Sequence, residues 1–159
     1  MQEQRLHSSD LIWPIFICEG ENITEDVASM PDVKRYSIDR VVELARTATE
    51  LNIPAIALFP KTPEKLKDAA GSEALNDQNL VCQAVRAIKV ACPELGIVCD
   101  VALDPYTDHG HDGILDEQGR IVNDGTVDKL VQQARILAAA GCDITVSYTH
   151  LTLPTMELV

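Results

Sequence analysis

Residues 97–113 read Ile-Val-Cys-Asp-Val-Ala-Leu-Asp-Pro-Tyr-Thr-Asp-His-Gly-His-Asp-Gly. The first seven are apolar apart from Asp100, which predicts a buried β-strand over residues 97–103. Pro105 breaks the pattern, and residues 104–113 form a loop that carries three more aspartates and two histidines. Parallel α/β folds place their active sites where strands end. The sequence therefore predicts a functional site at this strand end.

Asp100 is the residue that favours a site over a plain surface loop. Strand alternation would place Asp100, Ala102 and Asp104 on one side. A carboxylate within an apolar strand is costly to bury unless it is paired, hydrogen-bonded or bound to a cation. A solvated acidic loop punctuated by proline and glycine is the alternative interpretation, and it leaves Asp100 unexplained.

Apolar runs and amphipathic stretches alternate along the rest of the chain. Strands are predicted at residues 11–17, 53–59 and 142–145, and helices at 38–51, 80–91 and 127–138. Loops are predicted at 18–36 and 65–77, a tight turn at 116–119, a helix cap at Thr126 and a helix end at Gly141. Strands separated by helices imply parallel pairing, hence a doubly wound sheet or part of a (β/α) barrel.

Composition restricts the partners. The net charge of −12 disfavours nucleic acid and anionic membranes, which leaves small molecules or proteins. No apolar run approaches membrane-spanning length, and no signal-peptide core is present, so a cytoplasmic location is expected. Five cysteines without a C-x-x-C pair indicate free thiols in a reducing compartment. The length, 159 residues, falls short of the ~250 of a complete eight-fold barrel.

The segment DVALDPYTDHGHDG, residues 100–113, resembles the metal-loop signature of the porphobilinogen synthases, also called δ-aminolevulinic acid dehydratases. DLIWPIFICEGEN, ASMPDVKRYSID and GSEALND are similar to further parts of that family. The resemblance covers about residues 5–144. It implies that residues 1–145 are the N-terminal half of a (β/α)8 barrel, here a truncated half-barrel with parallel strands alternating with helices.

Zinc-dependent members of that family have cysteines where this chain has Ala102, Asp104 and Asp112. The resemblance therefore implies the magnesium-type branch, with Asp104 and Asp112 as possible metal ligands, and zinc is not expected at this loop. Aspartate oxygens suit hard cations such as Mg²⁺, whereas zinc favours thiolate and imidazole. Asp100 matches a catalytic aspartate of the family, expected to orient or deprotonate the substrate amine or a bound water.

The resemblance also implies an activity. Family members condense two molecules of 5-aminolevulinate to porphobilinogen with loss of water, through two Schiff-base lysines on later strands, in homo-octamers. Neither lysine motif occurs in these 159 residues, so the chain alone is expected to be inactive. Lys61 is interpreted as a loop charge and not as a Schiff-base lysine.

Residues 146–159 depart from the family pattern and resemble a translated sequencing adapter. They are expected to be a non-native tail, and a genuine strand is the alternative, because Val, Tyr and Thr favour strands. Two other functions stay open: a different metal-binding lyase that uses the Asp/His loop by itself, or a non-catalytic half-barrel that self-associates through exposed strand edges.

Overall fold

The computed structural model describes residues 5–147 and contains a six-stranded sheet. Four strands pair in parallel in the order in which they occur: β1 (Ile12–Ile17), β4 (Ala55–Pro60), β5 (Gly96–Asp100) and β6 (Ile144–Val146). Three helices connect them: α1 (Ile38–Glu50), α2 (Leu80–Ala91) and α3 (Asn123–Ala140). Each new strand adds beside the previous one without reversal, as in a (β/α) barrel and unlike a doubly wound sheet. The predicted partial barrel is confirmed.

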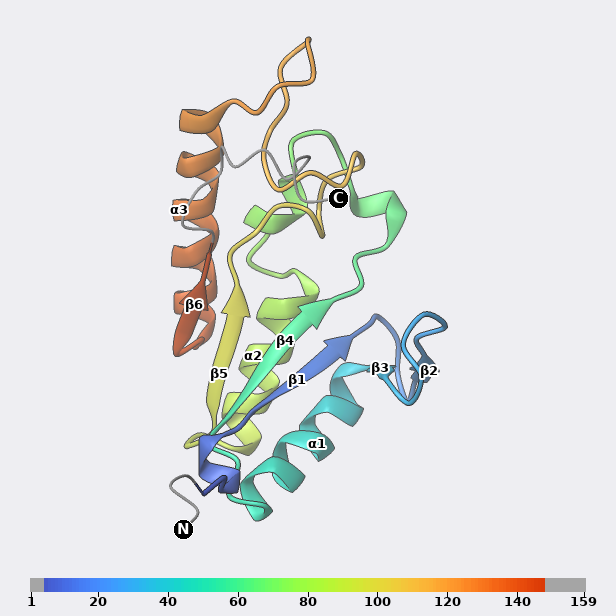
Figure 1. Cartoon of the computed structure of the whole chain (residues 1–159), viewed down its shortest axis with the longest axis vertical. Coiled ribbons are helices and arrows are strands. Elements are labelled where there is room, and N and C mark those ends of the chain that lie inside the picture. Colours follow the sequence, from blue (N-terminus) through green and yellow to red (C-terminus); the bar gives the residue numbers. More distant parts are fainter. Residues whose placement is uncertain (1–4, 148–159) are drawn as a thin grey trace.

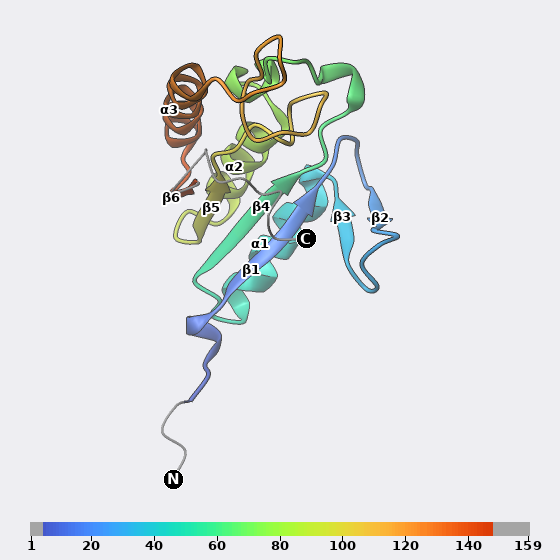
Figure 2. The same cartoon turned by 45° about the horizontal axis from the view of Figure 1, so that its top comes forward.

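All three helices cover the same face of the sheet (Figures 1 and 2). Strand alternation turns Ile15, Ile56 and Ile97 toward them, and these side chains are at most 1% exposed. Opposite them lie small and branched residues of the helices, which allow close packing: Val41, Ala45, Ala84, Val85 and Ile88. This apolar layer holds the strands in register, so it also fixes where each strand ends.

The other face of the sheet carries none of the described helices (Figure 2). Alternate residues of β1 and β4 point to it, and the rings of Phe16 and Phe59 meet there with centroids 5.7 Å apart. Asp100 ends β5 on this same face, because its neighbour Cys99 packs into the helix side. Ile12 and Ile144 lie on it as well and are 54% and 50% exposed. In a closed barrel this would be the interior surface.

The predicted loop at 18–36 is wrong in part, because it contains a small antiparallel hairpin. Strands β2 (Thr24–Asp26) and β3 (Lys34–Tyr36) pair with each other, and β3 extends the sheet beside β1. Cross-strand ion pairs join Glu25 to Arg35 at 3.2 Å and Asp26 to Lys34 at 3.5 Å. Such three-residue charged strands have no apolar alternation that sequence reasoning could detect.

Two predicted boundaries also need correction. The strand predicted over 97–103 ends at Asp100, and Val101, Ala102 and Leu103 are all buried, so the expected alternation stops there. Helix α3 begins at Asn123 and not at Thr126. The Thr126 hydroxyl lies inside the helix, where it donates to the Val122 carbonyl at 2.7 Å and accepts from the Ile114 amide at 3.0 Å.

Two local predictions are confirmed, because Gly141 ends α3 with a φ of 110° and residues 116–119 form a turn. The structure adds a cap on α2, where the Asn79 side chain accepts from the Cys82 amide at 2.9 Å. The loop predicted at 65–77 contains two short 3-10 helices, η2 (Glu64–Leu66) and η3 (Ser72–Leu75). Among the described residues, no helix is long and apolar enough to cross a membrane.

The five cysteines are free, and all but Cys142 are buried. Of the predicted tail, only residues 146 and 147 fall within the described part, and there Val146 pairs with Asp100 as the last residue of β6. The remainder, residues 148–159, lies outside the described residues.

Candidate functional site

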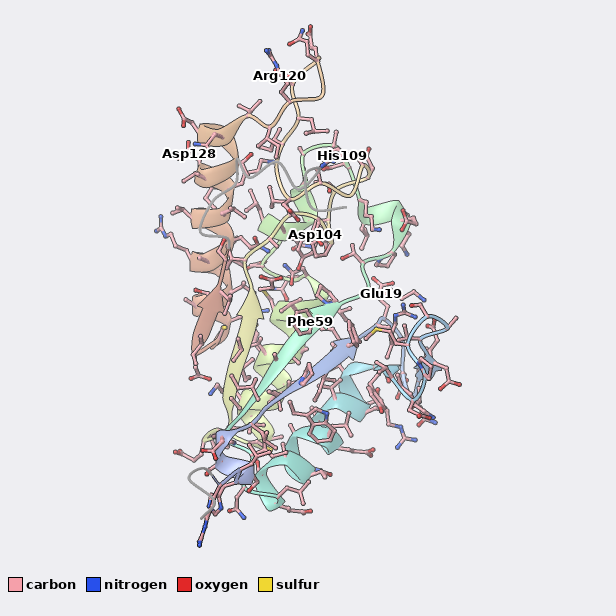
Figure 3. All side chains as sticks on the ribbon, viewed as in Figure 1. Glu19, Phe59, Asp104, His109, Arg120 and Asp128 are labelled. Atoms are coloured by element: carbon pink, nitrogen blue, oxygen red, sulfur yellow. The ribbon has the colours of Figure 1, made fainter. Side chains whose placement is uncertain are left out.

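The parallel strands β1, β4 and β5 all end at one edge of the sheet, beneath the long loop that joins β5 to α3 (Figure 1). Figure 3 shows Asp104, in this loop, above Phe59, which is near the end of β4. Asp100 is the last residue of β5, so its carboxyl group also stands at the edge. Asp100 was predicted inside the strand, and the structure places it at the strand end instead.

A tight turn returns the chain toward that edge immediately after β5. The Leu103 carbonyl accepts hydrogen bonds from the amides of Tyr106 at 2.8 Å and Thr107 at 3.0 Å. Leu103, Tyr106 and Thr107 are at most 4% exposed, so the root of the loop belongs to the core. This turn places Asp104 near Asp100 by folding the chain back, and not by the strand alternation expected from the sequence.

Asp100, Asp104 and Asp112 form an acidic cluster. Burial, then the charges of Asp112 and Asp100, and a side-chain hydrogen bond with Asp112 together raise the pKa of Asp104 to about 6. Burial, followed by the charge of Asp112, also raises the pKa of Asp100. The structure thus brings together the three aspartates that the sequence singled out. Burial and mutual repulsion give the cluster a strong preference for a proton or for an external positive charge.

The acidic cluster should make the stability of the chain depend on pH. An unfolded aspartate titrates near ~3.9, so between about pH 4 and pH 6 the folded state binds more protons than the unfolded state. The stabilising contribution of the Asp104 proton is complete below that window and is lost as the pH rises through about 6.

Asp104→Asn should therefore raise the free energy of unfolding at pH 7.5 by about 2 kcal/mol, with solvent screening allowed for, and by only about a third of that at pH 4.5. The asparagine amide keeps a hydrogen-bond donor for Asp112 and cannot ionise. Urea denaturation of the chain at the two pH values measures this, with the exposed Asp128→Asn as control. An unchanged pH dependence in Asp104→Asn would contradict the electrostatic assignment.

Backbone contacts and a histidine pair hold the outer part of the loop. His109 accepts through Nδ1 from the His111 amide at 3.1 Å, so its Nε2 carries the proton and donates to the Ala69 carbonyl at 3.3 Å. The Thr107 hydroxyl donates to the His111 carbonyl at 3.0 Å. The His109 imidazole thus fastens this loop to the loop after β4, and His111 takes part in these hydrogen bonds through its backbone. These contacts favour a structural role for His109.

Helix α3 holds the same loop from the other side through two polar side chains, of which sequence reasoning missed Gln133 and assigned Thr126 a different role. Gln133 is 1% exposed and donates through Nε2 to the Ala102 carbonyl at 3.1 Å. Thr126 is fully buried and binds the Ile114 amide. The available signal was the position of Gln133 on the apolar stripe of the helix, in register with Leu130 and Leu137.

Lys61 follows β4 at the same edge, where its ammonium group pairs with Glu25 of the hairpin at 2.8 Å. This hydrogen bond is the main reason that the pKa of Glu25 is lowered. Lys61 remains about half exposed, in agreement with its interpretation as a loop charge, although it is paired and not simply solvated.

The donor chemistry of the loop suits a hard cation. Asp104 and Asp112 offer carboxylate oxygens, and Mg²⁺ is often held by one or two carboxylates with water completing its shell. Within residues 5–147, no group of three or more His, Cys, Asp or Glu side chains is arranged to hold a metal ion. Cys99, next to the cluster in sequence, packs into the core on the helix side. Carboxylate oxygens of this kind suit a partly hydrated Mg²⁺ better than zinc, which favours thiolate and imidazole ligands.

Comparison with known proteins identifies relatives of this chain. The family model "Delta-aminolevulinic acid dehydratase" matches residues 1–149. A curated protein of that name from Bradyrhizobium diazoefficiens is 56% identical over 144 residues, which cover 91% of this chain and 40% of the relative. "Delta-aminolevulinic acid dehydratase 1, chloroplastic" from Arabidopsis thaliana is 43% identical over 145 residues, which cover 90% of this chain and 33% of the relative.

A solved structure is similar to this chain in fold. It is δ-aminolevulinic acid dehydratase (porphobilinogen synthase) from Toxoplasma gondii in complex with the reaction product porphobilinogen, 40% identical with a TM-score of 0.88. The match covers 92% of this chain and 42% of that one. The chain thus spans about one third to two fifths of the length of these three relatives.

Proposed function

Because the chain belongs to the δ-aminolevulinic acid dehydratase family, we propose that it is part of a porphobilinogen synthase, a lyase that condenses two molecules of 5-aminolevulinate in tetrapyrrole biosynthesis. The observation that carries this proposal is the acidic cluster at the sheet edge, where Asp100 and Asp104 both have raised pKa values. Residues 1–145 would form the first half of the barrel. The Schiff-base lysines would come from the other half.

Asp100 would orient the substrate ammonium group and accept a proton from it or from a bound water. A carboxyl group with a raised pKa is a better general base near neutral pH than an ordinary aspartate. Asp104 and Asp112 would supply negative charge to the same ammonium group. The positive charge of the ammonium group would offset the repulsion among the three carboxylates, which otherwise favours protonation of Asp104. Binding of the substrate would therefore reduce the repulsion among the carboxylates of the acidic cluster.

Asp104 and Asp112 could also hold Mg²⁺, as in the magnesium-type branch of the family. The bound ion would supply a positive charge that stabilises the ionised carboxyl groups. A thermal melt at pH 7.5 with and without Mg²⁺ tests this. We expect Mg²⁺ to raise the melting temperature of the unsubstituted chain. The double variant, Asp104→Asn with Asp112→Asn, should show no such shift. An equal shift in the variant would place the ion elsewhere.

The activity is testable in a chimaera. Residues 5–145 would replace the matching segment of the Bradyrhizobium diazoefficiens relative, to which the chain is 56% identical. We expect the purified chimaera to form porphobilinogen from 5-aminolevulinate at a rate within about ten-fold of the intact relative, equivalent to about 1.4 kcal/mol in the barrier. The 159-residue chain alone should form none. A folded chimaera without activity would contradict the proposed function.

Two further features of the parent protein are proposed with it. The family resemblance supports a homo-octamer, which the mass of the chimaera in solution would test. Five free thiols suit the reducing environment of a bacterial cytoplasm, although the Arabidopsis thaliana relative is named as chloroplastic. Fractionation of the source cells would distinguish these locations.

A further inference from the structure

Gln133 contacts the loop of the acidic cluster from a different element. It lies midway along α3, which runs beside β5 and below the loop that follows β5 (Figure 1). Its Nε2 donates to the Ala102 carbonyl at 3.1 Å, and the side chain is 1% exposed. Ala102 is the residue midway between Asp100 and Asp104. The side-chain amide of Gln133 therefore binds the backbone between the two aspartates that the proposed reaction uses.

The orientation of this amide is determined by its partner. A peptide carbonyl can only accept, so the nitrogen of Gln133 must face Ala102 and the oxygen must point away. In the described part of the chain, that buried oxygen has no hydrogen-bond partner. A leucine or methionine would fill the same core position without this unpaired oxygen, but it would leave the buried Ala102 carbonyl without its donor. The glutamine is therefore explained by its hydrogen bond to that carbonyl and not by apolar packing.

We propose that Gln133 is a positioning residue, which sets the separation of the Asp100 and Asp104 carboxyl groups by holding the Ala102 carbonyl against α3. The inference rests on the proposed function of the acidic cluster. A second contact from the same helix supports it, because Thr126 binds the Ile114 amide on the far side of Asp112. Helix α3 thus anchors the loop on both sides of the segment that carries Asp104 and Asp112.

Two substitutions in the chimaera separate positioning from packing. Gln133→Met keeps the length and volume of the side chain but has no donor, so we expect kcat to fall roughly 10- to 100-fold, as for a small displacement of reacting groups, with little change in KM. Gln133→Glu regains a donor only when its carboxyl group is protonated. Its kcat relative to the native segment should therefore rise as the pH falls from 8.5 to 6, while that of Gln133→Met stays constant.

Gln132→Met is the matched control, because Gln132 is the exposed neighbour on the same helix and its side chain donates to the Asp128 carbonyl of that helix at 3.3 Å. It should leave kcat within two-fold, on the order of 0.4 kcal/mol. All assays are run well below the melting temperature of each variant, so that loss of folded protein does not contribute.

The outcomes distinguish this inference from the proposed function. No activity in the folded chimaera with the native segment would contradict both. An active native segment, with Gln133→Met equally active at every pH, would overturn the positioning role alone. A lower melting temperature with unchanged kcat would likewise reduce Gln133 to a structural residue and overturn the inference.

Discussion

Asp100→Asn in the chimaera should lower kcat by roughly 10²- to 10⁴-fold, the range for loss of a general base. Asparagine keeps the size of the side chain and its place at the end of β5, but it can neither accept a proton nor carry a charge. Burial and the charge of Asp112 already oppose ionisation of Asp100, so removal of the charge should not destabilise the fold. Activity should therefore fall while the melting temperature stays the same or rises.

The control is Asp128→Asn. Asp128 is exposed on the side of α3 that faces away from the acidic cluster (Figure 3). Porphobilinogen formation and thermal unfolding are measured for both variants. Equal activity of Asp100→Asn and Asp128→Asn would remove Asp100 from the mechanism, and a collapse of the melting temperature in Asp100→Asn would assign it a structural role.

The second large effect concerns the sheet face without helices. We expect the 159-residue chain to self-associate at micromolar concentration, because Ile12, Ile144 and Val146 on this face are each at least half exposed. Burial of an isoleucine contributes about 1.5–3 kcal/mol, so the paired change Ile12→Lys and Ile144→Lys should weaken association at least ten-fold, which is about 1.4 kcal/mol. Sedimentation equilibrium measures the association constant.

Val90→Lys with Val131→Lys is the matched control for that experiment. Both valines are at least half exposed, at 88% and 54%, but they lie on α2 and α3, away from the open sheet face. This pair should leave association unchanged within about two-fold, or roughly 0.4 kcal/mol. A monodisperse native chain, or equal effects of the two pairs, would contradict a role for the open face.

The main features of the fold and site could be predicted because they depend on local pattern. An apolar strand interrupted by one aspartate and ended by proline marks both β5 and the edge where Asp100 stands. The β2–β3 hairpin was missed because its strands are short and charged. Ion pairs join these strands, and their sequences show no alternation of apolar and polar residues. The start of α3 was misplaced because Thr126 has the chemistry of a cap but uses its hydroxyl inside the helix.

The acidic cluster was predicted in composition but not in geometry. Asp104 lies near Asp100 because a turn at Leu103 reverses the chain, and the contact with Asp112 spans eight positions of loop. Gln133 lies 31 positions from the carbonyl that it binds. Such contacts depend on tertiary packing between distant segments. Local residue patterns in a single sequence do not reveal them.

If Asp100, Asp104 and Asp112 face the amino group of the substrate, a crystal structure of the chimaera with porphobilinogen should show it. The aminomethyl nitrogen of the product should lie within about 3 Å of a carboxyl oxygen of Asp100 or Asp104. Product bound with that nitrogen facing other groups, and the three aspartates turned to solvent, would contradict it.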